Sequence, residues 1–199
     1  MTIATRLTLV RILIIPVFIV VFYLQYTWQV SFGYILAAVI FFIASITDVL
    51  DGHFARKMNQ VSEMGKLLDP IADKLLISSA ILLLVEARMV AAWVAIIIIG
   101  REFIISAFRM VSASRGNIIA ARGLGKAKTV LQTIAIIFIL IQDWPFRYLL
   151  PTDQWGQMLT IGNIILYVSV ILSIISLVEY IVLNKHVFKA DQPEKEAVK

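Results

Sequence analysis

The sequence predicts an all-α protein that crosses a membrane six times. Of its 199 residues, 60% are hydrophobic, and the mean hydropathy is +0.90. A soluble domain rarely reaches that composition, whereas a multi-spanning membrane protein does. The chain also contains six apolar runs, each near the ~20 residues that a helix needs to cross the hydrocarbon core. There is no cysteine, which excludes disulfides, thiol catalysis and thiolate metal sites.

The first three runs lie in the amino-terminal half. A short basic start precedes the first run and resembles a signal peptide, but no small-residue cleavage pattern follows, so we expect a retained helix. The connection Gly52–Lys66 between the second and third runs is polar and basic. The expected spans are Thr8–Tyr26 with a kink at Pro16, then Phe32–Asp51, and a third that ends near Val85.

The start of the third span has two readings. Asp69 would be an N-cap if Pro70 occupies the first helical position. Alternatively, the helix begins near Ser62 and Pro70 lies within its early turns. The residues favour neither reading over the other.

The last three runs follow the same pattern. Arg101 and Glu102 interrupt the fourth run, and a basic, glycine-containing loop, Ser112–Lys128, follows it. The segment Asp143–Gln157 is polar and aromatic, as expected of an external loop. The expected spans are Ala91–Val111, one with its core at Val130–Ile141, and Thr160–Leu183.

The positive charges predict the orientation. Of the 18 Lys and Arg, only Arg88 and Arg147 fall in the expected outer loops. The positive-inside rule therefore places both termini at the cytoplasmic face of the cell membrane. The net charge of +5 suits anionic headgroups and not nucleic acid, because no basic patch is interleaved with stacking aromatics. We expect one transmembrane catalytic domain, residues 1–185, and a charged cytoplasmic tail, residues 186–199.

Four aspartates fall within positions 48–73. Asp48 and Asp51 are three residues apart and Asp69 and Asp73 are four apart, so on helices each pair shares a face. Near the bilayer centre each carboxylate would cost about 2.5–3.5 kcal/mol, and the four would repel one another. Two divalent cations would neutralise them, and oxygen-only ligands favour Mg²⁺ or Mn²⁺ over Zn²⁺. Paired metals are a familiar arrangement for phosphoryl chemistry.

These aspartates belong to a longer pattern with fixed spacing. It reads Asp48-x2-Asp51-Gly52-x2-Ala55-Arg56-x8-Gly65-x3-Asp69-x3-Asp73. Every fixed position matches, so the segment resembles the signature of the CDP-alcohol phosphotransferase family. The resemblance implies that family's fold, and a reaction in which a CDP-linked lipid such as CDP-diacylglycerol donates a phosphatidyl group to an alcohol and releases CMP.

The resemblance also implies roles for single residues. All four aspartates would ligate the two cations, and Asp73 would be the catalytic base that takes the proton of the acceptor hydroxyl. The glycines would permit close approach to the nucleotide, and Arg56 would offer a planar donor fork for phosphate. The implied CDP-lipid-binding residues are Thr8, Asp48, Gly52, Ala55, Arg56 and Gly65. Membrane lipids and a second copy of the chain, as a homodimer, are the implied partners.

A second element concerns the acceptor. Gly125-Lys126-Ala127-Lys128-Thr129, and Arg101-Glu102-Phe103 followed by Arg109, are similar to elements of the branch that makes phosphatidylglycerophosphate. The acceptor implied is sn-glycerol 3-phosphate, its phosphate held by Arg109, Lys126 and Lys128, with Arg115 and Arg122 as further candidates. Ordinary positive-inside charge is the plain alternative for this loop. For Arg101 and Glu102 it is a structural ion pair.

The amino terminus departs from the pattern of that branch. Ala4-Thr5 stands where the branch carries Pro-Asn, although Thr8 and Arg11 match. Thr5 would then supply a hydroxyl, or the chain would prefer another acceptor, such as serine, inositol phosphate or phosphatidylglycerol. Outside this chemistry, a divalent-cation transporter, or a structural subunit whose aspartates form a salt-bridge cluster, would explain the acids. Neither explains the fixed glycine, alanine and arginine positions.

Overall fold

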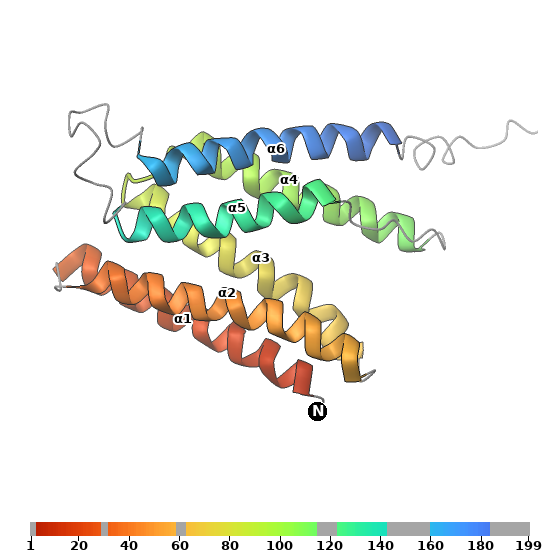
Figure 1. Ribbon diagram of the computed structural model, residues 1–199, viewed down its shortest axis with the longest axis horizontal. Coiled ribbons are helices and arrows are strands. Elements are labelled where there is room, and N and C mark those ends of the chain that lie inside the picture. The colour runs from red at the N-terminus through yellow and green to blue at the C-terminus, as the bar shows by residue number, and fades with distance from the viewer. Residues whose placement is uncertain (1–2, 29–31, 59–62, 115–122, 143–159, 184–199) are drawn as a thin grey trace, which may run out of the picture.

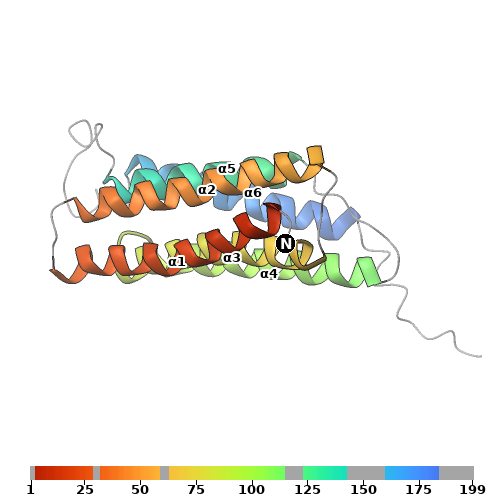
Figure 2. The ribbon, with the colours of Figure 1, turned by 90° about the horizontal axis from the view of Figure 1, so that it is seen from below.

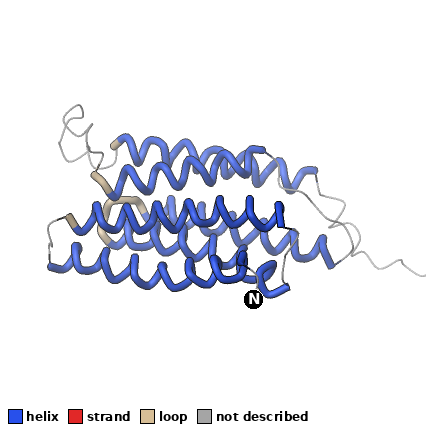
Figure 3. The backbone as a smooth tube through the Cα atoms, turned by 60° about the horizontal axis from the view of Figure 1, so that its bottom comes forward, coloured by secondary structure: helices blue, strands red, loops and turns tan. Residues whose placement is uncertain are grey.

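The computed structural model describes residues 3–28, 32–58, 63–114, 123–142 and 160–183. All the regular secondary structure in these residues is α-helix (Figure 3), which confirms the all-α prediction. The six helices are α1 (Ile3–Trp28), α2 (Gly33–Met58), α3 (Glu63–Glu86), α4 (Ala92–Ser114), α5 (Gly123–Leu140) and α6 (Ile161–Leu183).

The helices run up and down in two layers. Figure 2 shows α1, α3 and α4 in one layer and α2, α5 and α6 in the other. Contacts join the layers at α1 with α2, α4 with α6 and α3 with α5. The starts of α1, α3 and α5 and the ends of α2, α4 and α6 therefore lie toward one end of the bundle (Figure 1), which we call the aspartate end.

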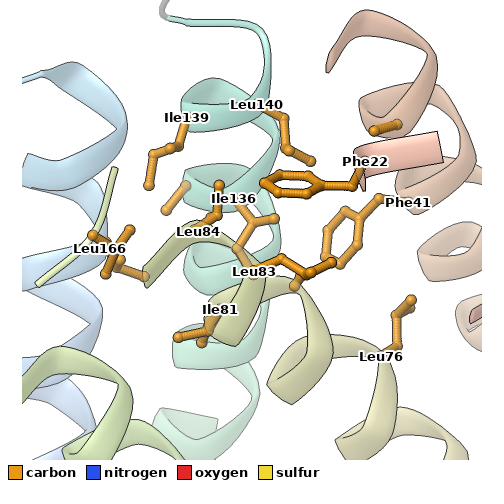
Figure 4. Close-up of a cluster of buried hydrophobic side chains, with 14 of the residues drawn as sticks. Phe22, Phe41, Leu76, Ile81, Leu83, Leu84, Ile136, Ile139, Leu140 and Leu166 are labelled. Atoms are coloured by element: carbon orange, nitrogen blue, oxygen red, sulfur yellow. The ribbon is translucent and has the colours of Figure 1, made fainter. Parts of the chain in front are cut away.

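A buried apolar core joins the layers. Phe22 of α1, Phe41 of α2, Leu84 of α3 and Ile136 of α5 are at most 1% exposed and point toward one another (Figure 4). The rings of Phe18 and Phe41 pack at a centroid distance of 5.7 Å. Full burial of a side chain of this size contributes roughly 1.5–3 kcal/mol, so the core between α1, α2, α3 and α5 stabilises the end of the bundle opposite the aspartate end.

The outer surface is also apolar. Leu13, Ile96 and Met110 are among many large hydrophobic side chains that are mostly exposed, which suits a lipid environment. By length and composition, two stretches among the described residues, Thr8–Trp28 and Ile161–Leu183, are able to span a membrane. Shorter apolar stretches lie in α2 and α5. These features suggest a membrane protein, and the six spans stay a prediction.

Two helix boundaries differ from the sequence prediction, and a third decides between the two starts considered for the third helix. The prediction of a polar connection over Gly52–Lys66 was wrong, because α2 continues to Met58 and α3 begins at Glu63. Strong helix formers such as alanine, arginine, lysine and methionine let the helices extend beyond their apolar parts. Of the two starts considered for the third helix, the one near Ser62 is confirmed. Likewise α5 begins at Gly123, so residues 123–128 of the predicted loop Ser112–Lys128 are helical.

The turn between α3 and α4 lies at the opposite end. Arg88 has a positive φ of 58°. The Met89 amide donates to Leu84 O over 2.8 Å and the Arg88 amide to Val85 O over 3.0 Å, which is the Schellman pattern that closes a helix. The side-chain amide of Asn163 in α6 donates to Met89 O over 3.1 Å. The turn therefore fixes where α6 begins against α3 and α4.

The contact between α5 and α6 depends on a glycine. A Cβ on Gly162 would lie 2.6 Å from Ile139 Cγ1 and 2.9 Å from the Ile139 backbone nitrogen. The backbones of the two helices approach closely there, as small residues permit in membrane helix pairs. Gly162 therefore sets the separation of α5 and α6.

Candidate functional site

The two aspartate pairs lie at matching depths on neighbouring helices. Asp48 and Asp51 precede the end of α2 by ten and seven residues, and Asp69 and Asp73 follow the start of α3 by six and ten. At a rise of 1.5 Å per residue, Asp48 and Asp73 are each about 15 Å from the aspartate end, and Asp51 and Asp69 about 10 Å. Asp48 and Asp73 therefore lie at similar depths along α2 and α3, and so do Asp51 and Asp69.

The side chains of all four aspartates lie outside the described part of the structure. The fit of the implied metals rests on the donor set: four carboxylates at two matching levels on two antiparallel helices suit a pair of hard, oxygen-seeking cations. Among the side chains that are described, none form a group of three or more His, Asp or Glu able to hold a metal ion.

A cavity of about 230 Å³ lies next to these levels. Its walls come from α1, α2, α3 and α5, beginning one turn beyond Asp48 and Asp73 on the side away from the aspartate end. The lining is apolar except for a few polar side chains. It comprises Arg11, Phe42, Ser45, Ile46, Leu76, Ile77, Thr129, Val130, Thr133, Ile134 and Ile137.

The cavity is closed inside and open at one side. Arg11 is fully buried and Leu76 is 2% exposed, so they form its inner wall. Phe42 on α2 is 48% exposed and Val130 on α5 is 58% exposed, and Ile46 and Ile134 are exposed beside them. The opening therefore lies between α2 and α5, on the apolar flank of the bundle.

A buried ion cluster occupies the other side of the start of α5. The Arg101 side chain on α4 is 7% exposed, and its Nη1 donates to Glu102 Oε1 over 2.9 Å. Its Nη2 donates to Ser176 Oγ on α6 over 2.9 Å. Lys128 on α5, 2% exposed, forms an ion pair with the same Glu102 oxygen. One carboxylate therefore holds two cations, and the cluster joins α4, α5 and α6.

The residues predicted to hold the acceptor phosphate are placed differently from one another. Lys128 is buried in this ion cluster, whereas Arg109 is exposed on α4. The side chain of Lys126 lies outside the described residues, as do Arg115 and Arg122. Arg101 Nη2 lies 4.0 Å from where a Cβ on Gly125 would be. Arg101, which the prediction left out of this group, therefore lies near the first turn of α5.

The predicted donor-binding residues share one region. Thr8 is fully buried in α1. Gly52, Ala55 and Arg56 are on α2 and Gly65 is on α3, with side chains outside the described part. Each of the twelve predicted site residues lies within ten residues of a helix terminus at the aspartate end. The topology therefore gathers in one region residues that span positions 8 to 128 of the sequence.

Two residues at the site escaped the sequence prediction of roles. Arg11 was noted only as a match of pattern, yet it is fully buried and lines the cavity. Its spacing of three from Thr8 puts both on one helix face, which was an available signal. No signal in the sequence pointed to Ser176, because a serine in an apolar helix is common. Its role becomes visible only from its hydrogen bond with Arg101 in the structure.

Comparisons with known proteins show the family of the chain. A family model described as CDP-alcohol phosphatidyltransferase matches residues 1–175. The chain is 36% identical to the CDP-diacylglycerol–glycerol-3-phosphate 3-phosphatidyltransferase of Bacillus subtilis, over 92% of this chain and 95% of that protein. It is 37% identical to a protein of the same name in Wigglesworthia glossinidia brevipalpis, covering 90% and 93%.

A plant relative matches as well. The CDP-diacylglycerol–glycerol-3-phosphate 3-phosphatidyltransferase 2 of Arabidopsis thaliana is 40% identical over 90% of this chain and 78% of its own length. The family model spans all four aspartates and the cavity lining. The chain belongs to the CDP-alcohol phosphatidyltransferase family.

Proposed function

We propose that this protein transfers a phosphatidyl group from CDP-diacylglycerol to sn-glycerol 3-phosphate, giving phosphatidylglycerophosphate and CMP. The observation that carries the proposal is the similar depth of Asp48 and Asp73, and of Asp51 and Asp69, along α2 and α3. The names of the three relatives support both the donor and the acceptor.

In the proposed reaction, Asp73 takes the proton of the acceptor hydroxyl. The acceptor oxygen attacks the β-phosphate of the donor, the bond to the bridging oxygen breaks, and CMP leaves with the electron pair. An aspartate is a weak base in water, so its position must supply most of its effect. When bound, two divalent cations, Mg²⁺ or Mn²⁺, held by Asp48, Asp51, Asp69 and Asp73, would neutralise charge on the pyrophosphate.

The donor would lie with its nucleotide against Thr8, Gly52, Ala55, Arg56 and Gly65. Its lipid portion would enter through the opening between α2 and α5, because the cavity behind that opening is apolar and begins one turn from the aspartates. A chain that enters there stays in contact with the membrane.

The acceptor phosphate would bind at the start of α5. Arg109, Lys126 and Lys128 are the proposed contacts, and each lies within five residues of a helix terminus at the aspartate end. Positive charge near the first turn of a helix favours an anion further, because the helix dipole has the same sign there.

The proposed setting is the cell membrane, with six spans, both termini and the aspartate end cytoplasmic. Residues 1–185 would form the catalytic domain, residues 186–199 the charged tail, and two copies a homodimer. The basic residues near the aspartate end support this orientation through the positive-inside rule.

The reaction is tested with purified protein, labelled CDP-diacylglycerol and Mg²⁺ or Mn²⁺. We expect CMP release that depends on glycerol 3-phosphate and exceeds release with serine, inositol phosphate or phosphatidylglycerol. A faster reaction with one of those acceptors would reassign the acceptor. No CMP release with any acceptor, together with uptake of divalent cations into liposomes, would favour the transporter.

Asp73→Asn tests the proposed base. Because the amide cannot accept the proton, we expect kcat to fall by at least about 100-fold, the lower bound usual for a lost acid–base group, while CDP still protects the protein against thermal unfolding. Asp153→Asn, between α5 and α6, is the matched control and should keep full activity. Normal turnover by Asp73→Asn would remove the base from the mechanism.

A further inference from the structure

The ion cluster on α4, α5 and α6 has a role beyond joining helices. Two cations, Arg101 and Lys128, share one oxygen of Glu102, so the three groups keep a net charge of +1. All three lie largely away from solvent, with Arg101 and Lys128 almost fully buried. A surplus positive charge in such surroundings is costly on its own and favours the approach of an anion.

The cluster contacts the segment that the proposed function uses for the acceptor. Arg101 lies near Gly125 in the first turn of α5, and Lys128 is one turn further along. Lys128 belongs to the ion cluster, and the next residue along α5, Thr129, lines the cavity near the aspartates.

Lysine and arginine are long and flexible, and ordering them costs side-chain entropy. Glu102 holds one end of each, and Ser176 accepts a second hydrogen bond from Arg101. Glu102 is on α4 and Lys128 is on α5, so their ion pair joins these two helices directly. Both helices also pack against α6. Preorganised charges bind a ligand more tightly than mobile ones.

We propose that Glu102 is a positioning residue for the phosphate of the acceptor: it holds Lys128 and Arg101 toward the first turn of α5, and Ser176 supports it through Arg101. This inference rests on the proposed function, in which Lys128 binds that phosphate. A purely structural ion pair would instead affect folding alone.

The test is Glu102→Gln, which keeps the size of the side chain and removes its charge. We expect the KM for glycerol 3-phosphate to rise about tenfold, the loss typical of one charge-assisted hydrogen bond, with the KM for CDP-diacylglycerol changed less than twofold. The matched control is Glu86→Gln at the opposite end of the bundle, where Tyr23 donates to the carboxylate over 2.5 Å. Both KM values should stay unchanged in that variant.

A structural pair would lower the unfolding temperature and the active fraction and leave both KM values as they are, and that result would overturn the proposal. If Glu102→Gln does not fold, Ser176→Ala decides, because it removes only a neutral hydrogen bond. We expect it to raise the KM for glycerol 3-phosphate alone by a few-fold, and an unchanged KM would overturn the proposal. If the unmodified protein releases no CMP from this substrate pair, the proposed function itself fails.

Discussion

At the scale of single residues, the two lysines of the α5 start differ. Lys126 and Lys128 are two positions apart, so on a helix their side chains point about 200° apart. Lys128 is buried against Glu102, and position 126 is on another side of α5. The two lysines would reach a shared phosphate only from different sides.

Lys126→Ala measures the contribution of the second lysine. In this variant the bound acceptor phosphate would lose one cationic contact, so we expect the KM for glycerol 3-phosphate to rise at least about tenfold. CDP-diacylglycerol would lose no contact, so its KM should stay nearly constant. Lys195→Ala, in the carboxy-terminal segment, controls for the loss of a positive charge as such. Equal changes in both KM values for Lys126→Ala would contradict a separate acceptor pocket.

The sequence predicts which residues belong to the candidate site, but it does not predict the environment of each side chain. The spacing of Asp48 through Asp73 locates the aspartates without a structure, because helical periodicity fixes which residues share a face. Partners on distant helices do not follow from local periodicity, which is why the link from Arg101 to Ser176, 75 residues away, could be found only in the fold.

At the scale of helices, two glycines allow the cost of overpacking to be measured separately from the gain in helix propensity. In Gly162→Ala the new methyl group meets the backbone of α5, which cannot move aside cheaply. We expect a loss of about 1–3 kcal/mol, as for other overpacked sites, measured by unfolding in detergent. In Gly100→Ala the methyl group meets nothing within 4 Å, so stability should stay constant or rise by up to about 1 kcal/mol. Equal destabilisation by both would contradict close packing at Gly162.

The existence of all six helices followed from the sequence, but their ends did not. Apolar runs mark the part of each helix that suits a membrane, and α2, α3 and α5 continue past it with charged residues. Hydropathy does not detect these extra helical turns, because arginine, lysine and glutamate are polar but are still good helix formers. The extra turns carry many of the site residues, from Gly52 to Arg56 and from Gly65 to Asp69.

At the scale of the whole molecule, the orientation is open to a clean experiment, because the chain has no cysteine. Gln142→Cys lies just after α5, at the end opposite the aspartates, and Ala197→Cys lies in the tail. In intact cells a membrane-impermeant thiol reagent should label Gln142→Cys at once, and Ala197→Cys only after the membrane is permeabilised. Labelling of both positions in intact cells would contradict the cytoplasmic tail.

The opening between α2 and α5 has a kinetic consequence. A donor that arrives sideways is drawn from a two-dimensional pool, so its effective supply is its mole fraction in the surface and not its amount per litre. Adding inert detergent at a fixed bulk quantity of both substrates should therefore slow turnover in proportion to surface dilution, whereas the dependence on the water-soluble acceptor should not follow that ratio.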